Sequence, residues 1–328
     1  MNGNAMLRRV IAYDLQVAES FDLAAEIEHR IVFLAQRLIA SGRRTLILGV
    51  SGGVDSATTG RLCQLAVERV RKTGYQARFL AMRLPYGSQA DEADARLALA
   101  FIQADCVLTV DVQAASDCAL AALQAGGLTF KNDQQRDYIH GNIKARQRMI
   151  AQYAVAGALC GLVVGTDHAA EAVTGFFTKH GDGAADLMPL NGLTKRRVRA
   201  IAQALGAPAA LVTKVPTADL ESLAPGRPDE EVLGVTYGEI DDFLEGRPVR
   251  RAAARTIVRC YQATEHKRRP PITPIRSLDC RHSVAPQGEH VMPWGSSREV
   301  AIAGRPVHGD GREVAAVCAL HNPHHAVG

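Results

Sequence analysis

The sequence lacks several features that define large classes of proteins. Its seven cysteines are scattered and form no C-x-x-C pair, which argues against a zinc ribbon or a disulfide framework and favours a reducing compartment. No apolar run approaches the roughly 18 residues that a membrane-spanning helix needs. The first residues also lack a basic segment followed by an apolar stretch, so we expect a cytoplasmic protein with no membrane partner.

Charge of one sign is not in large excess either. The 328 residues include 38 basic and 34 acidic side chains, which gives a net charge of +4. This balance gives little support for a nucleic-acid partner, and the basic cluster at residues 266–269 (HKRR) suits a phosphate-bearing small molecule as well as nucleic acid. We therefore expect small-molecule substrates and no nucleic acid.

Short apolar runs alternate with helical patterns along much of the chain. Four runs predict buried parallel strands at residues 45–50, 77–84, 107–112 and 162–165. The first 40 residues predict a leading helix, and further helices are predicted at 54–71, 91–104, 114–124, 142–159, 195–205, 230–233, 237–244 and 249–264. The alternation predicts an α/β fold in which a doubly wound parallel sheet is flanked by helices.

Two later segments differ in composition. Residues 206–228 are rich in Ala, Pro, Gly and Thr and predict a long loop, a kind of segment that often covers an active site. The stretch 275–328 carries six histidines with many glycines and prolines and little periodicity. We expect one domain at residues 1–274 and a flexible tail of unknown role at 275–328.

The run LILGVSGGVDS, which ends at Ser56, is the most informative stretch. An apolar strand stops at Ser-Gly-Gly and a helical pattern follows, so backbone amides and the helix dipole converge where an anion can bind. Gly52 and Gly53 allow close approach of a ligand, and Asp55 is repulsive beside phosphate unless a cation lies between them. The run predicts a nucleotide phosphate site with Mg²⁺ held partly by Asp55; the alternative is an ordinary tight turn with a Ser N-cap.

The same run excludes two common nucleotide motifs. No Lys-Ser or Lys-Thr follows as in a Walker loop, and the Gly-x-Gly-x-x-Gly spacing of dinucleotide folds is absent. Ser-Gly-Gly-x-Asp-Ser is instead the loop of ATP pyrophosphatases, which cut ATP between the α and β phosphates. We therefore expect a pyrophosphate-releasing site.

A second junction, GTDHAAE, follows the fourth predicted strand. Because parallel strands end at one edge of the sheet, this junction can face the phosphate loop. Thr166 offers a hydroxyl, and Glu171 lies four residues after Asp167, so that Glu171 could supply a second carboxylate for Mg²⁺. The alternative is ordinary helix capping; the presence of Asp55 favours the metal site.

The run TGFFTKHGDG, at residues 174–183, is dense in glycine and aromatic residues. One of its two phenylalanines could stack on a planar ring, with Lys179 and Asp186 gripping polar groups; the alternative is a buried corner. His168 and His266 are candidate acid/base groups, although no spacing requires that role.

Four further residues are candidates for ATP contacts. Arg83 and Gln89 lie in the stretch at the end of the second predicted strand, at the same sheet edge, with a capping role for Ser88 or Gln89 as the alternative. Lys195 opens a helix and could reach a phosphate, with a solvated helix start as the alternative. Thr217 lies in the predicted loop.

These motifs together resemble those of the bacterial ammonia-dependent NAD synthetases, a family within the ATP pyrophosphatase superfamily. The matching strings are SGGVDS, RLPYGSQADE, GNIKARQRM, GTDHAAEAVTGFFTKHGDG, PTADL, LGVTY and EHKRRPPI, which span roughly residues 5 to 274. The resemblance implies an adenine nucleotide alpha-hydrolase-like fold. It also implies formation of NAD, AMP and pyrophosphate from deamido-NAD, ATP and ammonia, by a homodimer with deamido-NAD at the subunit interface.

The resemblance assigns a role to each candidate residue. Asp55 and Glu171 would be the catalytic Mg²⁺ ligands. The implied ATP contacts are Gly49, Val50, Ser51, Gly52, Gly53, Val54, Asp55, Ser56, Arg83, Gln89, Thr166, Lys195 and Thr217. The implied deamido-NAD contacts are Arg146, Lys179, Asp186, His266 and Lys267.

Other functions compete with this interpretation. A tRNA-modifying or GMP-forming ATP pyrophosphatase is the nearest rival, although thiolating members usually need paired cysteines and a tRNA partner needs a larger basic surface. A nucleotide sensor without catalysis is a rival of another class, and the presence of both Asp55 and Glu171 argues against it. The chain has no room for a glutaminase domain before the synthetase region, so free ammonia is the expected donor, with a separate glutaminase as the alternative.

Overall fold

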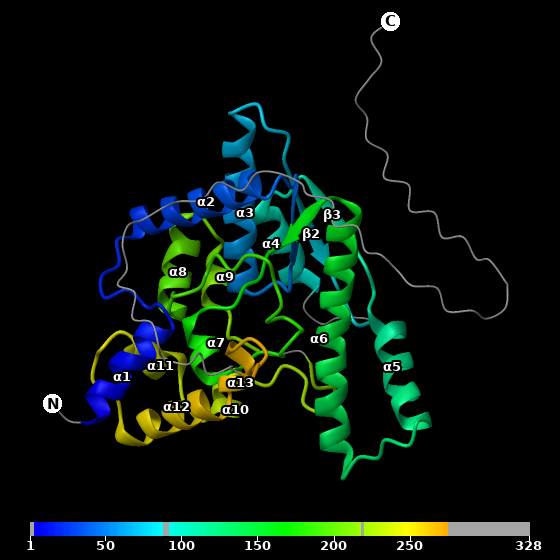
Figure 1. Ribbon diagram of the computed structural model, residues 1–328, viewed down its shortest axis with the longest axis vertical. Helices are drawn as coiled ribbons and strands as arrows, with labels where there is room; N and C mark the ends of the chain where they lie inside the picture. Colours follow the sequence, from blue (N-terminus) through cyan, green and yellow to red (C-terminus); the bar gives the residue numbers. More distant parts are fainter. Residues whose placement is uncertain (1–2, 88–91, 218–219, 275–328) are drawn as a thin grey trace, which may run out of the picture. The chain divides into compact units, whose positions relative to one another are not determined.

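A four-stranded parallel sheet forms the centre of the molecule (Figure 1). The computed structural model describes residues 3–87, 92–217 and 220–274. The strands are β1 (Thr45–Gly49), β2 (Arg78–Arg83), β3 (Cys106–Thr109) and β4 (Gly161–Val163), in the order β3-β2-β1-β4. The predicted α/β fold is therefore confirmed, whereas the predicted tail at 275–328 lies outside the described residues.

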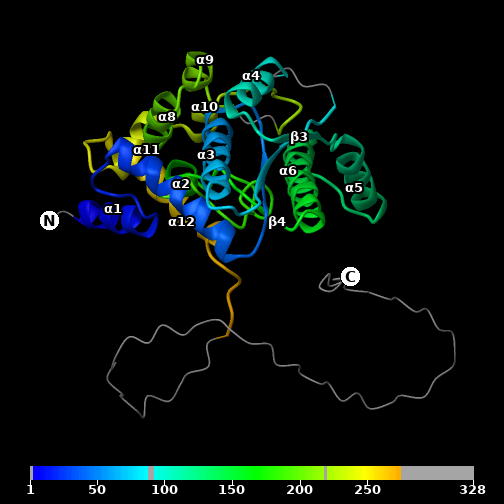
Figure 2. The same cartoon turned by 90° about the horizontal axis from the view of Figure 1, so that it is seen from above.

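Alternate residues of the strands face two separate layers of helices. Leu46, Leu48 and Phe79 pack in one cluster, and Ile47 and Leu80 pack in another on the opposite face. The first layer contains α2 (Leu23–Ala40), α3 (Val54–Arg71), α4 (Glu92–Ile102) and α8 (Lys195–Ala204). Figure 2 shows α6 (Asp133–Ala158) on the other side of the sheet, with α5 (Gln113–Ala125) beside it. Both faces are covered, as a doubly wound sheet requires.

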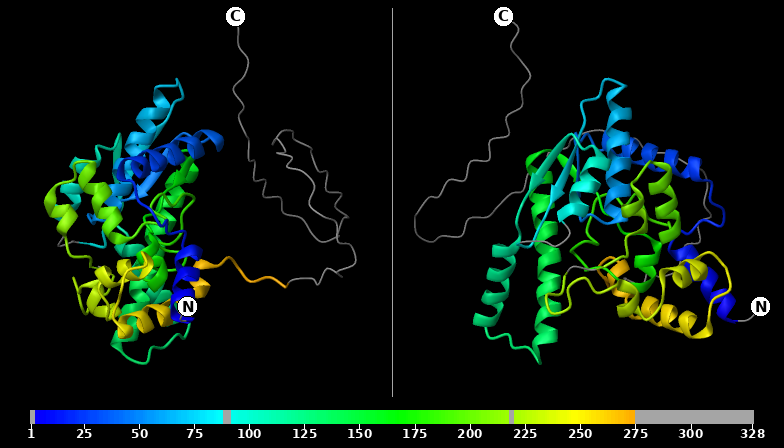
Figure 3. Two further views of the ribbon diagram at one scale, coloured as in Figure 1. Left: turned by 90° about the vertical axis from the view of Figure 1, so that its left-hand side faces the viewer. Right: turned by 180° about the vertical axis from the view of Figure 1, so that it is seen from behind.

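A third cluster of helices lies beyond one end of the sheet. It unites α1 (Gly3–Asp14), α7 (Ala169–Thr174), α11 (Tyr237–Leu244) and α12 (Arg251–Ala263). Figure 3 shows blue α1 next to yellow α11 and α12, although these helices come from opposite ends of the described chain. Three short helices complete the described chain: α9 (Ala209–Thr213), α10 (Asp229–Leu233) and α13 (Glu265–Arg268). Among the described residues, none of the helices has the length and apolar character that would cross a bilayer.

Four predictions about elements were wrong in detail. The leading helix is two helices, α1 and α2, because Asp22 caps a new helix by accepting a hydrogen bond from the Ala25 amide. Helix α6 begins at 133 rather than 142, since Asn132 caps it and Gly141 is tolerated inside it. Strand β3, at one edge of the sheet, is exposed rather than buried. The predicted loop at 206–228 contains α9.

Candidate functional site

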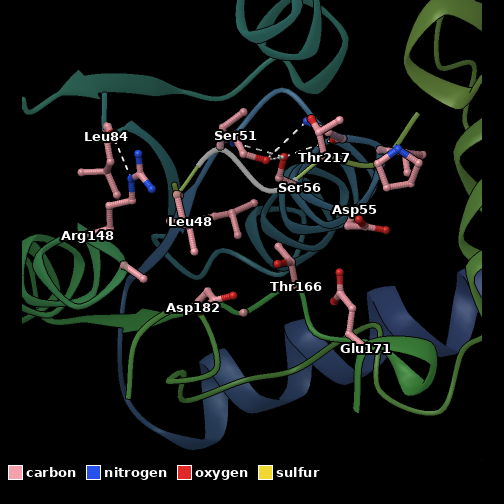
Figure 4. Close-up of a pocket in the computed structure, with 18 of the residues that line it drawn as sticks. Leu48, Ser51, Asp55, Ser56, Leu84, Arg148, Thr166, Glu171, Asp182 and Thr217 are labelled. Carbon is pink, nitrogen blue, oxygen red and sulfur yellow. Dashed lines mark hydrogen bonds between the residues drawn. The ribbon is translucent and has the colours of Figure 1, made fainter. Parts of the chain in front are cut away.

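The parallel sheet has a topological switch point between β1 and β4. From β1 the chain moves to β2 and β3 on one side, whereas β4 lies on the other side of β1. The segments that follow β1 and β4 therefore meet at the carboxyl edge of the sheet, where ligands bind in folds of this kind. The expected convergence of the two junctions is confirmed, because Asp55 and Thr166 line the same pocket, which Figure 4 shows.

The loop after β1 presents backbone amides at the start of α3. Gly52 has φ +84°, and a Cβ on it would lie 2.9 Å from the Ala95 amide nitrogen, so this position requires glycine. Gly53 is the N-cap of α3 and has no side chain with which to satisfy the first amides of the helix. The Ser51 amide donates to Ser56 Oγ at 3.3 Å and closes the turn. The arrangement suits an anion.

Gln152, which the sequence did not indicate, supports this loop from α6. The Gly49 amide donates to Gln152 Oε1 at 2.8 Å, and Gln152 lies on α6, on the opposite side of the sheet from α3. Its polar side chain in the middle of a helix face carried no sequence signal. The contact ties the last residue of β1 to α6.

Four ionisable side chains meet at the start of three helices. Lys195 Nζ lies 2.6 Å from Asp55 Oδ2, and it is 2% exposed as the first residue of α8. His168 Nε2 lies 3.4 Å from Asp55 Oδ1 and 3.6 Å from Glu171 Oε1. Asp241 of α11 accepts hydrogen bonds from the backbone amide of Lys195 at 3.0 Å and thereby fixes the start of α8.

These contacts set the charge of the cluster. Burial raises the pKa of Glu171 to about 8, an effect that the Asp55 charge reinforces and His168 opposes. Burial also acts to raise the pKa of Asp55, but Lys195 and His168 outweigh it and hold that pKa below its usual range. The pKa of Lys195 is raised, because the attraction of Asp55 and Glu171 exceeds the effect of burial. Asp55 and Lys195 are therefore both charged at neutral pH.

The donor set fits a divalent cation. Asp55, His168 and Glu171 each offer a ligand atom, and these atoms lie within 4.8 Å of one another. Asp55 Oδ1 is buried and accepts no hydrogen bond within the described part of the chain. Two carboxylates with an unsatisfied oxygen are suited to a hard cation such as Mg²⁺. The structure thus brings together the two predicted metal ligands, with His168 added.

One pocket of about 310 Å³ collects most of the predicted ATP contacts. The predicted residues that line it are Gly49, Val50, Ser51, Gly53, Val54, Asp55, Ser56, Arg83, Thr166, Glu171, Lys195 and Thr217. Gly52 shapes the loop but does not line the pocket, and Gln89 lies outside the described residues. Arg83 also pairs with Glu92, Nη1 to Oε1 at 3.0 Å.

The predicted deamido-NAD contacts lie apart from this lining. Lys179 Nζ donates to the His266 carbonyl at 2.6 Å, and Arg146 Nη2 donates to the Lys179 carbonyl at 3.3 Å. Lys267 Nζ donates to the Phe177 carbonyl at 2.7 Å. We call Arg146, Lys179, His266 and Lys267 the surface basic cluster.

Three other predicted features have distinct positions. Asp186 is not in the surface basic cluster, since its Oδ2 accepts a hydrogen bond from the Val163 amide of β4 at 2.8 Å. Phe176 lines the pocket, whereas the Phe177 ring lies 5.4 Å from Lys267 Nζ. Of the two candidate histidines, His168 is buried beside Asp55, and His266 is exposed.

Several lining residues had no sequence prediction. They are Arg148, Gln152, Asp182, Lys214, Leu220 and Asp229. Arg148 belongs to the string GNIKARQRM, which was the available signal, whereas Gln152 lies just after that string and had none. The others come from loops and helix starts whose path across the pocket depends on tertiary packing.

The chain resembles known proteins over most of its length. The family model for NAD synthase matches residues 26–271. The chain belongs to the NAD synthase family. A relative named NH(3)-dependent NAD(+) synthetase, from Streptomyces coelicolor, is 66% identical over 268 residues, which are 82% of this chain and 97% of the relative.

Solved structures of the NAD synthase family agree with this assignment. The crystal structure of NAD+ synthetase from Burkholderia pseudomallei is 60% identical, with a TM-score of 0.72 over 82% of this chain and 98% of that one. The structure of NMN synthetase from Francisella tularensis is 33% identical, with a TM-score of 0.67 over 78% of this chain and 99% of that one. The use of ATP by an enzyme of this family is consistent with a requirement for a divalent metal.

Proposed function

We propose that this member of the NAD synthase family amidates deamido-NAD with ammonia, uses ATP, and releases NAD, AMP and pyrophosphate. The relative at 66% identity carries the name of this activity. The observation that carries the proposal here is the 310 Å³ pocket, in which the phosphate loop meets Asp55, Glu171 and Lys195. The enzyme is then a ligase that forms a C–N bond in the last step of NAD biosynthesis.

ATP binds in this pocket with its phosphates at the start of α3. The free amides after Gly53 and the α3 dipole attract the phosphates, and Lys195 supplies a full positive charge beside Asp55. Asp55 and Glu171 would hold Mg²⁺, which supplies charge neutralisation on the phosphates when it is bound. The remaining ATP contacts are the lining residues Arg83, Thr166 and Thr217, with Gln89 as a further candidate.

Adenylylation comes first in the proposed reaction. The nicotinate carboxylate oxygen attacks the α-phosphorus, the bond to the bridging α–β oxygen breaks, and pyrophosphate leaves. The resulting acyl-adenylate is a mixed anhydride with AMP as its leaving group. Lys195 and the loop amides stabilise the charge that gathers on the departing pyrophosphate.

Ammonia completes the reaction by attacking the acyl carbon. The C–O bond to AMP breaks, the amide of NAD forms, and one proton leaves the nitrogen. Water in the pocket would hydrolyse the anhydride instead, so exclusion of water is essential. The side chains of Lys214, Thr217 and Leu220, which form part of the pocket wall, serve that purpose.

Deamido-NAD binds across the surface basic cluster. Arg146, Lys179 and Lys267 donate to backbone carbonyl oxygens, so their positive charges are available to the dinucleotide pyrophosphate. Burial lowers the pKa of Lys267, and Arg146 adds to this effect whereas Asp182 opposes it. Asp186 stays a proposed contact, at the edge of β4.

The protein acts as a homodimer in the cytoplasm in this proposal. The outer face of α6 carries Tyr138 and Ile150, which are 53% and 52% exposed, with the exposed Arg146 between them. A second copy that covers this face would place Arg146 beside the partner's dinucleotide. Size measurement by light scattering tests the dimer, and a monomeric Ile150→Arg variant with weaker deamido-NAD binding would support the shared site. The unpaired thiols of Cys106, Cys118 and Cys160 suit a reducing compartment.

One assay separates the proposal from its rivals. The protein is incubated with ATP, Mg²⁺, ammonium and either deamido-NAD or its mononucleotide analogue, and the products are separated. We expect equimolar NAD, AMP and pyrophosphate from deamido-NAD. A preference for the mononucleotide would favour the activity named for the Francisella tularensis relative, and ADP instead of AMP would contradict the whole proposal.

A further inference from the structure

One face of α6 holds residues 220–223. Asp137 accepts two hydrogen bonds from backbone amides of this segment, Ser222 N to Oδ1 at 2.9 Å and Leu223 N to Oδ2 at 2.8 Å. Lys144 Nζ donates to the Leu220 carbonyl at 3.0 Å and to Ser222 Oγ at 2.8 Å. Asp137 and Lys144 are 7% and 3% exposed, whereas Ser222 and Leu223 are exposed, so the helix side of each contact is shielded from water.

Gly141 lies between these two side chains on the helix. A Cβ on Gly141 would meet the Leu220 carbonyl oxygen at 3.0 Å and Leu220 Cβ at 3.1 Å. Since real Cβ atoms rarely approach so closely, any larger side chain at 141 would displace Leu220. Gly157 lies on the same helix, and a Cβ there would meet nothing within 4 Å.

The held segment forms part of the ATP pocket. Leu220 and Thr217 line the pocket, whereas Asp137, Gly141 and Lys144 do not. Lys214, which also lines the pocket, is fixed independently, because its Nζ lies 2.6 Å from Asp94 Oδ2 of α4. Helix α6 also carries Gln152, whose contact with Gly49 supports the phosphate loop. The same helix therefore supports two walls of one pocket.

We propose that Asp137, Gly141 and Lys144 are positioning residues that dock residues 220–223 on α6 and so set the wall of the ATP pocket. The inference rests on the proposed use of this pocket by ATP. When residues 220–223 are undocked for part of the time, the apparent affinity for ATP is the intrinsic affinity multiplied by the fraction of molecules in which they are docked. The deamido-NAD contacts on the outer side of the molecule are not part of this wall.

A matched pair of glycine variants tests the proposal. Hydrogen exchange of the peptide that covers residues 220–225 and the KM values for both substrates are measured for Gly141→Gln and Gly157→Gln. For Gly141→Gln we expect faster exchange at the Ser222 and Leu223 amides and a KM for ATP raised about fivefold to tenfold. The KM for deamido-NAD should change by less than about twofold, and Gly157→Gln should match the wild type in all three measurements.

The outcomes distinguish the docking of residues 220–223 on α6 from its effect on ATP binding. Equal exchange in both variants would overturn the docking, and faster exchange with an unchanged KM for ATP would overturn its role in the pocket. A wild-type protein that makes no NAD would defeat the proposed function, yet the exchange contrast would still report the docking. If Gly141→Gln does not fold, Asp137→Asn, which weakens the same two amide contacts, is compared with Asp133→Asn at an exposed position of the first turn of α6.

Discussion

The ATP pocket and the surface basic cluster differ in how the chain assembles them. The pocket residues stand at the ends of β1 and β4 and at the starts of α3, α7 and α8, and Lys195 is 2% exposed there. The cluster joins side chains from distant segments through backbone carbonyls, as Lys179 does with the carbonyl of His266. Sheet topology therefore fixes the first site, whereas the second depends on how the peripheral helices pack.

The two sites also differ in how their charged side chains are compensated. In the pocket, carboxylates and a lysine compensate one another at close range, so loss of one partner leaves an uncompensated charge. In the cluster, the lysines donate to neutral oxygens, and removal of one leaves the others in place. Substitutions in the pocket should act on catalysis, and substitutions in the cluster should act on the binding of one substrate.

Asp55→Asn should produce the largest effect. The variant keeps the shape of the side chain but loses the charge that pairs with Lys195 and would hold the proposed Mg²⁺, so NAD formation should fall by about 10³-fold or more. Turnover and circular dichroism are measured together, with Glu68→Gln on the same helix as the control. A folded Asp55→Asn enzyme with nearly normal turnover would remove Asp55 from the metal site.

The pH dependence of Mg²⁺ activation should follow Glu171. Burial raises the pKa of this carboxyl to about 8, so below that pH it is protonated and a proton must leave before it can bind a cation. The Mg²⁺ concentration for half-maximal activity should therefore rise about tenfold for each pH unit between pH 8 and pH 7, and level off above 8. A constant Mg²⁺ requirement from pH 7 to 9 would show that Glu171 does not take part.

Lys179→Ala tests the other side of the comparison. The loss of one half-buried cation should raise the KM for deamido-NAD about tenfold and leave the KM for ATP within about twofold. Lys72→Ala, at the exposed end of α3, is the matched control. Equal weakening of both substrates would mean that the pocket and the cluster are not separate sites.

Gln152→Leu should give the smallest effect. It leaves the Gly49 amide without its acceptor, which raises the KM for ATP about threefold and lowers stability by about 1–3 kcal/mol. Gln152→Glu keeps an acceptor at the same place and should restore most of both properties. If both variants behave alike in ATP kinetics and thermal unfolding, the hydrogen bond does not support the loop.

The sequence predicted the parts of the molecule that local patterns determine. The turn at Gly52 and the paired junctions that carry Asp55 and Glu171 follow from strand ends and helix starts, and a parallel sheet brings such ends together. The exposure of β3 was not predictable, because an apolar run does not reveal whether other elements cover its strand. Gln152 was missed for a similar reason, since its role depends on which helix face meets the phosphate loop.

The surface basic cluster shows a second limit of local patterns. Arg146 and Lys179 were assigned by resemblance to a family, and only the fold shows that they are neighbours. Asp186 was assigned to the same ligand, yet its carboxylate is engaged with the Val163 amide. Side chains that meet through peripheral packing leave no spacing in the sequence from which their proximity could be derived.

The transfer of carboxylate oxygen tests the central claim most directly. Deamido-NAD labelled with ¹⁸O in the nicotinate carboxylate is converted with unlabelled ATP and ammonia, and the AMP is analysed by mass spectrometry. If the carboxylate attacks the α-phosphorus in the pocket of Asp55 and Lys195, each AMP formed carries one labelled oxygen. Unlabelled AMP formed together with NAD would contradict the account.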